Sequence, residues 1–306
     1  MQLLVTGAAG FIGSNYVRHV LDETDADVTT LDALTYAGNR RNLDGVDESR
    51  HTFVEGDITD RKLVDDLVAD ADIVVNFAAE SHVDRSIEGA RQFVDTNVAG
   101  TQTLLEAAQE HGVDRFVQIS TDEVYGEIAD GTFDEHDRLD PRNPYAATKA
   151  SADHLALSYY ETHDVPVVIT RSSNNFGPRQ HPEKLIPKLI RRATRGEALP
   201  IYGDGSNVRE WTYVTDNCRA VDLVRQRGTL GEIYNIGSGD ERTNLDVARA
   251  VVDAVDADDE LIEFVEDRPG HDRRYALDSS KVRSLGWRPE VSFTEGLERA
   301  VEFYSE

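Results

Sequence analysis

The chain begins Met1-Gln-Leu-Leu-Val-Thr-Gly-Ala-Ala-Gly-Phe-Ile-Gly13, a short apolar run that leads directly into a glycine-rich turn. A stretch of helical character, 14–21, follows the turn. Glycines allow a tight turn and a close approach of backbone to ligand, and the amides and dipole at a helix start attract a pyrophosphate. Because the turn follows a strand and opens a helix, it has the context that this motif requires. We therefore predict a dinucleotide-binding fold.

A carboxylate ends the next predicted strand. Asp32 follows the predicted strand 28–31 (Val-Thr-Thr-Leu), about twenty residues beyond the glycine-rich turn. A carboxylate at this place accepts hydrogen bonds from the adenosine ribose and repels a 2′-phosphate, which favours NAD over NADP. The nearby cations Arg40 and Arg41 leave NADP open.

Strand and helix signals alternate through the first half of the chain and change in character after residue 170. The alternation predicts an α/β fold, a Rossmann-type doubly wound parallel sheet, over residues 1–170. Part of 211–240 is expected to return to this domain. Residues 171–306 are expected to form a smaller C-terminal α/β substrate domain over the carboxyl edge of the sheet, leaving the site between the two. The expected strands of the first half are 28–31, 51–55, 72–77, 115–120 and 165–170, and the expected helices are 97–111 and 144–163.

The side chains with the clearest chemical character follow the predicted strand 115–120, in Ser120-Thr-Asp-Glu-Val-Tyr-Gly126. Open α/β sheets bind ligands at the carboxyl ends of their strands. Successive side chains of a strand point to opposite faces, so Asp122 and Glu123 serve one substrate only if the chain turns there. Gly126 is compatible with such a turn.

A second candidate is the pair Tyr145 and Lys149. These two residues lie one turn apart from each other on a helix that is expected to start at Asn143-Pro144. A cation beside a phenol favours the phenolate, the base that hydride transfer needs.

Composition excludes several classes of protein. With 58 acidic and 32 basic residues, the formal charge of −26 argues against a broad nucleic-acid-binding surface. No apolar run reaches the roughly 18 residues of a membrane helix, so we expect a cytoplasmic protein without a membrane segment. The single Cys218 excludes a disulfide framework and a cysteine metal cluster, and we expect it in the core. Only five lysines accompany this acidity, a composition that resembles proteins from salt-accumulating cytoplasms.

The quoted motifs together resemble the extended short-chain dehydrogenase/reductases. Further motifs narrow the resemblance to the dTDP-glucose 4,6-dehydratases: 32–39 (DALTYAGN), 78–85 (AAESHVDR), 174–178 (NNFGP), 182–187 (PEKLIP) and 268–274 (RPGHDRR). The resemblance runs from residue 1 to about 290, and Thr121-Asp122-Glu123 is its most specific element. Phe176 stands where relatives commonly carry Tyr, which leaves substrate choice less defined.

The resemblance implies a reaction and a set of residues that perform it. Tyr145, assisted by Lys149 and Thr121, would take the proton of the glucose 4-hydroxyl while hydride leaves C4 for NAD. Glu123 would then remove the C5 proton, and protonated Asp122 would protonate the departing 6-hydroxyl. Hydride returns to C6, so the cofactor is reused. Two adjacent carboxylates suit opposite roles because their proximity discourages double ionisation.

The family's binding residues carry over to matching positions. The resemblance places NAD at Gly7, Gly10, Phe11, Ile12, Gly13, Asp32, Leu34, Thr35, Asp57, Ile58, Ala78, Ala79, Thr96, Ser120, Tyr145, Lys149 and Asn174. It places a sugar nucleotide at His82, Thr121, Asn174, Lys184, Leu185, Pro200, Tyr202, Arg209, Asn244, Arg268 and His271.

Three alternatives remain at this point. UDP-glucose presents nearly the same pyrophosphate and sugar as dTDP-glucose. A sugar-nucleotide 4-epimerase or decarboxylase shares the glycine-rich turn and the Tyr145–Lys149 pair, but needs no paired acid and base for elimination. A non-catalytic NAD-sensing protein would be expected to lose the Tyr, the Lys or the triplet, all of which are present.

Apolar positions in the neighbouring helices 90–110 and 144–163 predict a homodimer through a helix bundle.

Overall fold

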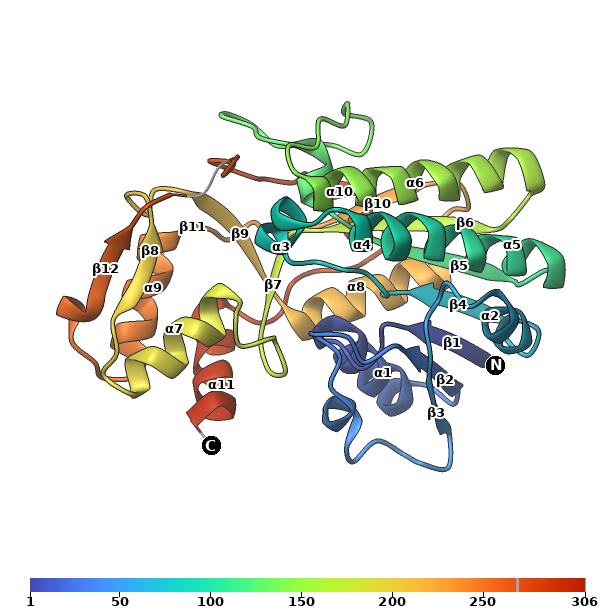
Figure 1. Ribbon diagram of the computed structural model, residues 1–306, viewed down its shortest axis with the longest axis horizontal. Coiled ribbons are helices and arrows are strands. Elements are labelled where there is room, and N and C mark those ends of the chain that lie inside the picture. The colour runs from blue at the N-terminus through green and yellow to red at the C-terminus, as the bar shows by residue number, and fades with distance from the viewer. Residues whose placement is uncertain (268–269, 306) are drawn as a thin grey trace.

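The computed structural model describes residues 1–267 and 270–305 of the chain. Within them, seven parallel strands form a sheet in the order β10-β6-β5-β4-β1-β2-β3 (Figure 1). The strand order reverses between β1 and β4, at the place where doubly wound sheets bind ligands. The predicted Rossmann-type sheet is confirmed. Its strands are β1 (Gln2–Thr6), β2 (Asp27–Asp32), β3 (His51–Glu55), β4 (Ile73–Asn76), β5 (Arg115–Thr121), β6 (Val167–Ser172) and β10 (Ile233–Ile236).

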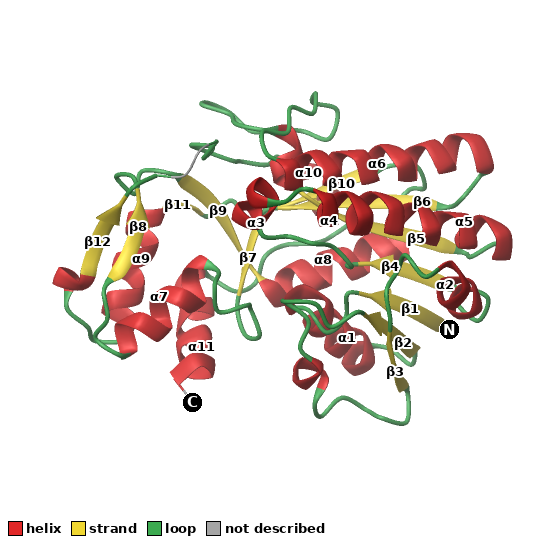
Figure 2. Cartoon of the chain, viewed as in Figure 1, coloured by secondary structure: helices red, strands yellow, loops and turns green. Residues whose placement is uncertain are grey.

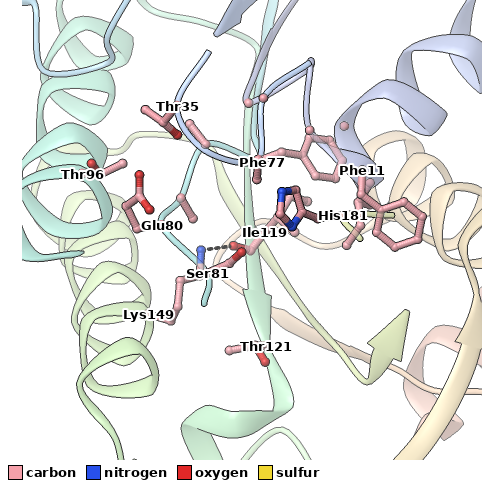
Figure 3. A pocket seen from close by; sticks show the side chains of 18 of the residues that line it. Phe11, Thr35, Phe77, Glu80, Ser81, Thr96, Ile119, Thr121, Lys149 and His181 are labelled. Atoms are coloured by element: carbon pink, nitrogen blue, oxygen red, sulfur yellow. Dashed lines mark hydrogen bonds between the residues drawn. The ribbon is translucent and has the colours of Figure 1, made fainter. Parts of the chain in front are cut away.

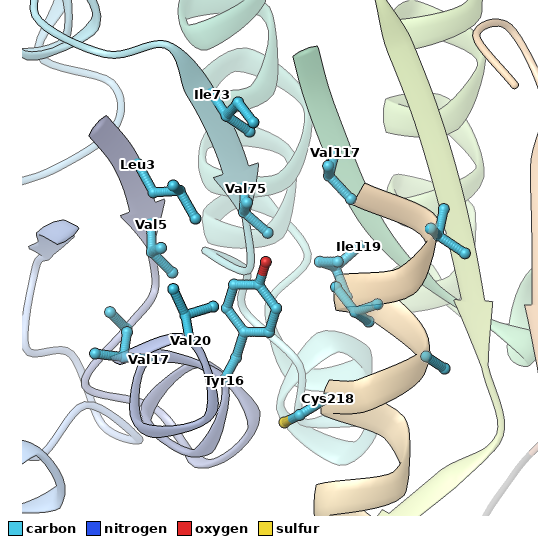
Figure 4. Close-up of a cluster of buried hydrophobic side chains, with 14 of the residues drawn as sticks. Leu3, Val5, Tyr16, Val17, Val20, Ile73, Val75, Val117, Ile119 and Cys218 are labelled. Atoms are coloured by element: carbon cyan, nitrogen blue, oxygen red, sulfur yellow. The ribbon is translucent and has the colours of Figure 1, made fainter. Parts of the chain in front are cut away.

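Helices cover both faces of this sheet. Alternate residues of a strand point to opposite faces, so Leu3 packs with α1 (Phe11–Glu23) and α8 (Val214–Arg227), while Leu4 belongs to the core on the other face. Figure 4 shows the first of these cores, with Cys218 on α8 beside Tyr16 on α1. Cys218 is fully buried, as expected. The helices of the other face are α2 (Arg61–Val68), α5 (Thr101–His111) and α6 (Pro144–His163).

A smaller unit continues from the carboxyl end of β6, because β7 (Asn174–Phe176) begins two residues after that strand ends (Figures 1 and 2). Its core gathers aromatic and aliphatic side chains such as Phe176, Trp211 and Leu297. The chain returns to the large sheet through α8 and β10 before completing this unit. The other elements of the unit are β8 (Leu199–Tyr202), β9 (Val208–Tyr213), β11 (Glu241–Thr243), β12 (Ile262–Val265), α7 (Leu185–Thr194), α9 (Asn244–Ala254) and α11 (Phe293–Ser305).

The segment before α5 differs from the uniform helix expected over 97–111. Residues 94–100 form a π-helical stretch, Val94–Gly100, between the short helix α4 (Arg91–Phe93) and α5. A π-helical turn changes the direction of side chains and is frequent at functional sites. Here Thr96 lines the cavity described below, and Asn97 is buried.

The polarity of the segment 80–86 predicts that it lies outside the core, and for two of its residues this prediction is wrong. Glu80 and Ser86 are buried. The Asn97 side chain accepts a hydrogen bond from Glu80 N and donates one to Glu80 O, and Gln92 donates to the Glu80 carboxylate. Ser86, in α3 (Val83–Glu88), donates its hydroxyl proton to the Val83 carbonyl. Internal hydrogen bonds thus replace the water that these polar groups lose.

The remaining short elements connect the larger ones. They are the 3-10 segments Arg40–Leu43, Asp122–Tyr125 and Asp259–Leu261 and the helix α10 (Ser280–Ser284). Throughout residues 1–267 and 270–305, every helix is too short or too polar to cross a membrane.

Candidate active site

A cavity opens at the carboxyl ends of β1, β4 and β5 and reaches toward the segment after β6 (Figure 3). It brings together most of the residues that the sequence assigned to a cofactor, and all five catalytic candidates. From the predicted set, its lining includes Gly7, Gly10, Phe11, Ile12, Gly13, Asp32, Thr35, Asp57, Ile58, Ala78, Ala79, Thr96, Ser120, Thr121, Asp122, Glu123, Tyr145, Lys149, Asn174 and Lys184.

The glycine-rich turn forms one wall of the cavity and tolerates no side chain at two positions. Gly7 has φ +66°, and a Cβ there would lie 2.5 Å from Ala78 N. A Cβ on Gly13 would collide with the Gly7 carbonyl oxygen. Gly10 precedes α1 and, within the described residues, no side chain caps the helix start. The first amides of α1 therefore face a space that suits a pyrophosphate.

Asp32 is fixed beside this turn by two backbone amides. Its Oδ2 accepts a hydrogen bond from Ala9 N at 2.8 Å, and its Oδ1 accepts one from Leu34 N at 2.8 Å. Leu34 takes part through this amide, with φ +49°, and its side chain does not line the cavity. Burial raises the pKa of Asp32, while the backbone hydrogen bonds oppose this. Arg40 stacks its guanidinium 4.9 Å from the centre of the Phe53 ring, on β3.

The chain turns immediately after β5, as two adjacent carboxylates sharing one cavity require. Thr121 ends the strand, and its hydroxyl oxygen accepts a hydrogen bond from Glu123 N at 3.3 Å at the start of a 3-10 segment. Gly126 closes the turn with φ +81°, where a Cβ would lie 2.5 Å from the Asp140 carbonyl oxygen. Asp122 and Glu123 both line the cavity in consequence.

The two carboxyl groups have different surroundings. Asp122 is 3% exposed, and the Thr121 hydroxyl donates to its Oδ1 at 3.1 Å. Its Oδ2 is buried and has no hydrogen-bond partner among the described residues. Burial first, then the negative charges of Glu123 and Glu210, raises the pKa of Asp122 to about 8. Glu123 instead accepts a hydrogen bond from Asn143 Nδ2 at 3.1 Å. At neutral pH, the raised pKa therefore favours the protonated form of the Asp122 carboxyl.

Helix α6 presents the phenol and the ammonium from one face. Asn143 caps the helix, its Oδ1 accepting from Ala146 N at 2.8 Å, and Pro144 starts it. Burial, followed by the Glu123 charge, raises the pKa of Tyr145, whereas a hydrogen bond with Thr121 lowers it. Lys149 donates from Nζ to the Ile119 carbonyl oxygen at 2.6 Å (Figure 3). The stabilisation of a Tyr145 phenolate by Lys149 stays a prediction.

Residues at the mouth of the cavity come from three separate loops. Lys184 donates from Nζ to the Ser81 carbonyl oxygen at 3.2 Å. His82 lies outside the cavity lining, with its Nε2 3.5 Å from a Glu183 carboxylate oxygen and its ring 6.4 Å from the Tyr36 ring. Of this polar group, Lys184 is the cation that lines the cavity.

Of the remaining predicted substrate residues, those that the structure describes lie in the smaller unit, outside the lining of this cavity. Tyr202 on β8 and His271 pack edge to face at 6.1 Å between ring centres. Arg209 on β9 donates to the Asp272 carbonyl oxygen at 2.8 Å, and its charge acts on Asp122. Leu185 starts α7, Pro200 belongs to β8, Asn244 starts α9, and Arg268 lies outside the described residues.

Sequence reasoning missed several residues of the site. Ser172 and Ser173 could have been predicted from their place at the end of β6, because Asp122 was identified from its place at the end of a parallel strand. Asn143 was recognised as a helix cap, but its second contact, with Glu123, had no signature in the sequence. Among the cavity-lining residues that were missed are Tyr36, Glu80, Ser81, Ser172, Ser173, Asn175, Gln180 and His181.

A doubly wound sheet, a glycine-rich turn and a buried Tyr-Lys pair define an enzyme of the extended short-chain dehydrogenase/reductase class. The chain belongs to the GDP-mannose 4,6 dehydratase family, whose sequence profile matches residues 4–300. This membership confirms the resemblance inferred from the motifs.

Three relatives are similar over nearly the whole chain. A low-salt glycan biosynthesis protein of Haloferax volcanii is 66% identical over 305 residues, 99% of this chain and 98% of that protein. A dTDP-glucose 4,6-dehydratase of Streptomyces antibioticus is 53% identical over 311 residues, 99% of this chain and 92% of that protein. The crystal structure of a dTDP-glucose 4,6-dehydratase of Streptomyces venezuelae, with NAD bound, has a TM-score of 0.97 at 52% identity. The match covers 100% of this chain and 97% of the Streptomyces venezuelae chain.

Proposed function

We propose that this protein catalyses the NAD-dependent dehydration of dTDP-glucose to dTDP-4-keto-6-deoxyglucose, a hydro-lyase reaction of deoxysugar biosynthesis, for example of rhamnose. The observation that carries the proposal is the unequal pair of carboxyl groups at the end of β5. Asp122 is buried and protonated at neutral pH, and Glu123 next to it is held by Asn143. Elimination of water needs one group to take a proton and another to give one.

The residues of the cavity divide the reaction between them. Tyr145 removes the proton of the 4-hydroxyl, assisted by Thr121 and Lys149. The ketone formed at C4 makes the C5 proton acidic, and Glu123 removes it. Asp122 transfers its proton to the 6-hydroxyl, which leaves as water. A proton returned to C5 completes the product, and the reaction involves no net oxidation.

The cavity fits NAD. The glycine-rich turn would receive the pyrophosphate, where an added Cβ at Gly7 would meet Ala78, and Asp32 would accept hydrogen bonds from the adenosine ribose. When bound, NAD takes a hydride from C4 of the sugar and supplies one to C6. The hydride is regained in the same cycle, so a firmly held cofactor needs no exchange.

The smaller unit would bind the nucleotide part of the substrate. Lys184 and Arg209 are the described cations that we assign to the pyrophosphate region, since Lys and Arg suit phosphate oxygens. Tyr202 would meet the nucleotide end, and His271, whose ring packs on that of Tyr202, would face the pyrophosphate and nearby groups. On this proposal the chain divides at about residue 170 into a cofactor domain, joined by part of 211–240, and a substrate domain.

Two wider features belong to the proposal. We expect a homodimer through the helices around 90–110 and 144–163, and the exposed apolar residues Ile87 and Val94 lie on the same part of the molecule. We also expect the enzyme to work in a salt-rich cytoplasm, given its net charge of −26.

The alternatives differ in what they require of the site. UDP-glucose would use the same catalytic residues, so the nucleobase alone separates it from dTDP-glucose. A 4-epimerase or decarboxylase needs no protonated Asp122 beside Glu123, and a non-catalytic NAD-sensing protein needs none of the catalytic residues. The acid and base pair therefore favours dehydration.

The decisive experiment is incubation of the purified protein with dTDP-glucose and with UDP-glucose, each with and without added NAD, in molar salt. Mass spectrometry of the products should detect the loss of one water from dTDP-glucose. A 4-epimer, which has the same mass as the substrate and is separated from it by chromatography, would identify an epimerase. An unaltered substrate under every condition would refute the proposal.

A further inference from the structure

Asp153 continues the catalytic face of helix α6 by one more turn. Tyr145, Lys149 and Asp153 are spaced by four residues each, so they lie one above another along the helix. Asp153 is fully buried and does not line the cavity. A buried carboxylate behind a catalytic ammonium needs a physical account, because ionised groups are rarely buried without a compensating partner.

The partners of Asp153 come from two strands of the sheet. Its Oδ2 accepts hydrogen bonds from the Ser120 hydroxyl at 3.0 Å and from Arg171 Nε at 2.9 Å. Its Oδ1 is buried and has no hydrogen-bond partner among the described residues. Arg171, on β6, is 2% exposed and stacks 4.8 Å from the centre of the Tyr125 ring. The carboxylate is therefore held at the back of β5, next to the strand end that carries the catalytic turn.

Asp153 is the acidic group whose charge favours the protonated form of Lys149. Burial lowers the pKa of Lys149 to about 8, and the charge of Asp153 opposes this. The other titratable groups nearby are Tyr145 on the same helix, Asp122 and Glu123 after β5, Tyr125 in the same turn and Arg171 on β6. Of these, Glu123 and Asp122 act on the Tyr145 phenol, and Arg171 pairs with Asp153.

We propose that Asp153 is a positioning residue that keeps Lys149 protonated and directed at the Ile119 carbonyl oxygen. Lys149 without this carboxylate would be an isolated ammonium in a buried site, and such a group loses its proton readily. Asp153 thereby extends the pair of Tyr145 and Lys149 to a line of three residues. Its effect on the protonation of Lys149 is independent of the substrate, and its effect on turnover rests on the proposed function.

A direct test follows the protonation of Lys149 by NMR. The chain has five lysines, so protein labelled with ¹³C at lysine Cε should give few signals, and Lys149→Arg identifies the one from Lys149. In Asp153→Asn, the pH at which Lys149 loses its proton should fall by about one unit or more. Asp153→Glu should restore it. Arg171→Gln should move it in the opposite direction, because it removes the cation that competes for Asp153.

The matched control is Asp222→Asn on α8. Asp222 is also buried and pairs with a buried arginine, Arg225, at 2.7 Å, so the substitution makes the same chemical change on the other face of the sheet. It should leave the Lys149 titration unchanged. The proposal would be overturned if the pH at which Lys149 loses its proton changed in neither Asp153→Asn nor Arg171→Gln.

A kinetic measurement separates this inference from the proposed function. The alkaline limb of the pH profile for C4 oxidation should shift to lower pH in Asp153→Asn, and return in Asp153→Glu. A loss of rate that is equal at every pH would indicate a structural role only and would contradict the proposal. If the wild-type protein fails to dehydrate dTDP-glucose while the NMR shift is seen, the proposed function fails and the role of Asp153 toward Lys149 stands.

Discussion

Asn143 donates a hydrogen bond from Nδ2 to Glu123 Oε2 at 3.1 Å while its Oδ1 caps helix α6. One side chain therefore fixes both the start of the helix that carries Tyr145 and the carboxylate assigned as the base. A helix cap is normally a matter of stability, worth about 0.5–2 kcal/mol. Here the same residue also links the start of α6 to the turn after β5.

Asn143→Asp should impair catalysis without loosening the helix. Asp and Asn cap helices equally well, but Asp places a second negative charge beside Glu123 and disfavours its ionised form. The acidic limb of the pH profile should move upward, and turnover at pH 7 should fall roughly tenfold. Asn143→Ser is the control, because it keeps a capping oxygen without adding charge. An equal shift of the limb in both variants would show that the lost Nδ2 hydrogen bond to Glu123, and not the added charge, is responsible.

The acid assigned to Asp122 gives turnover an alkaline limit. Its pKa is raised to about 8, so the carboxyl is neutral and able to donate below that pH, and it ionises above it. Elimination should therefore decline as the pH rises through about 8. Asp122→Asn cannot donate this proton, and turnover should fall by about 10²–10⁴-fold. Measurement of kcat against pH for both proteins checks this, and a wild-type profile that is flat to pH 10 would contradict it.

The same residue should show a conflict between stability and function. The folded pKa of Asp122 is raised above an unfolded value of about 3.9, so the native state holds the extra proton between about pH 4 and 8. Stability contributed by this group consequently decreases as the pH rises through that window. Asp122→Asn removes the group that ionises, so its melting temperature at pH 9 should exceed that of the wild type. The exposed Asp114→Asn is the control and should leave the melting temperature unaltered.

Replacement of Glu123 should separate oxidation at C4 from loss of water. Glu123→Gln retains the shape of the side chain but cannot remove the C5 proton, so reduced cofactor should accumulate on the enzyme after substrate is added. Absorbance of the reduced nicotinamide measures this directly, and mass spectrometry should find no dehydrated sugar. Glu263→Gln, on the exposed strand β12, is the control. Wild-type turnover by Glu123→Gln would remove Glu123 from the mechanism.

Much of the fold was predictable because local signals and tertiary structure agree. The glycine-rich turn has to follow a strand and precede a helix, and Gly7 and Gly13 have no room for a side chain. The site was less accessible to sequence reasoning. The role proposed for Asp153 depends on its hydrogen bonds with Ser120 and Arg171, which lie 33 and 18 residues away along the chain. Spacing on a helix predicts which side chains share a face, but it does not predict which strands lie opposite.

The polar segment 80–86 illustrates the other limit. Polarity predicted exposure, but Glu80 is buried because Asn97 and Gln92 supply its hydrogen bonds. Asn97 lies in the π-helical stretch Val94–Gly100, and such a stretch has no periodic signature that separates it from an α-helix. A sequence reports the polarity of a residue, whereas its burial depends on partners that only the fold provides.

Molar salt should stabilise the protein. Its net charge of −26 makes the folded state repel itself, and the distance over which charges act falls from about 10 Å at 0.1 M salt to about 3 Å at 1 M. The melting temperature should therefore rise steadily with KCl from dilute buffer to molar concentration. Asp256 and Asp259 belong to an exposed acidic cluster after α9, and Asp256 has φ +53°, which Asn also tolerates. The double variant Asp256→Asn/Asp259→Asn should fold and show a smaller dependence on salt, because it removes two of the repelling charges. A wild-type melting temperature that stays constant across this range would exclude self-repulsion as a determinant of its stability.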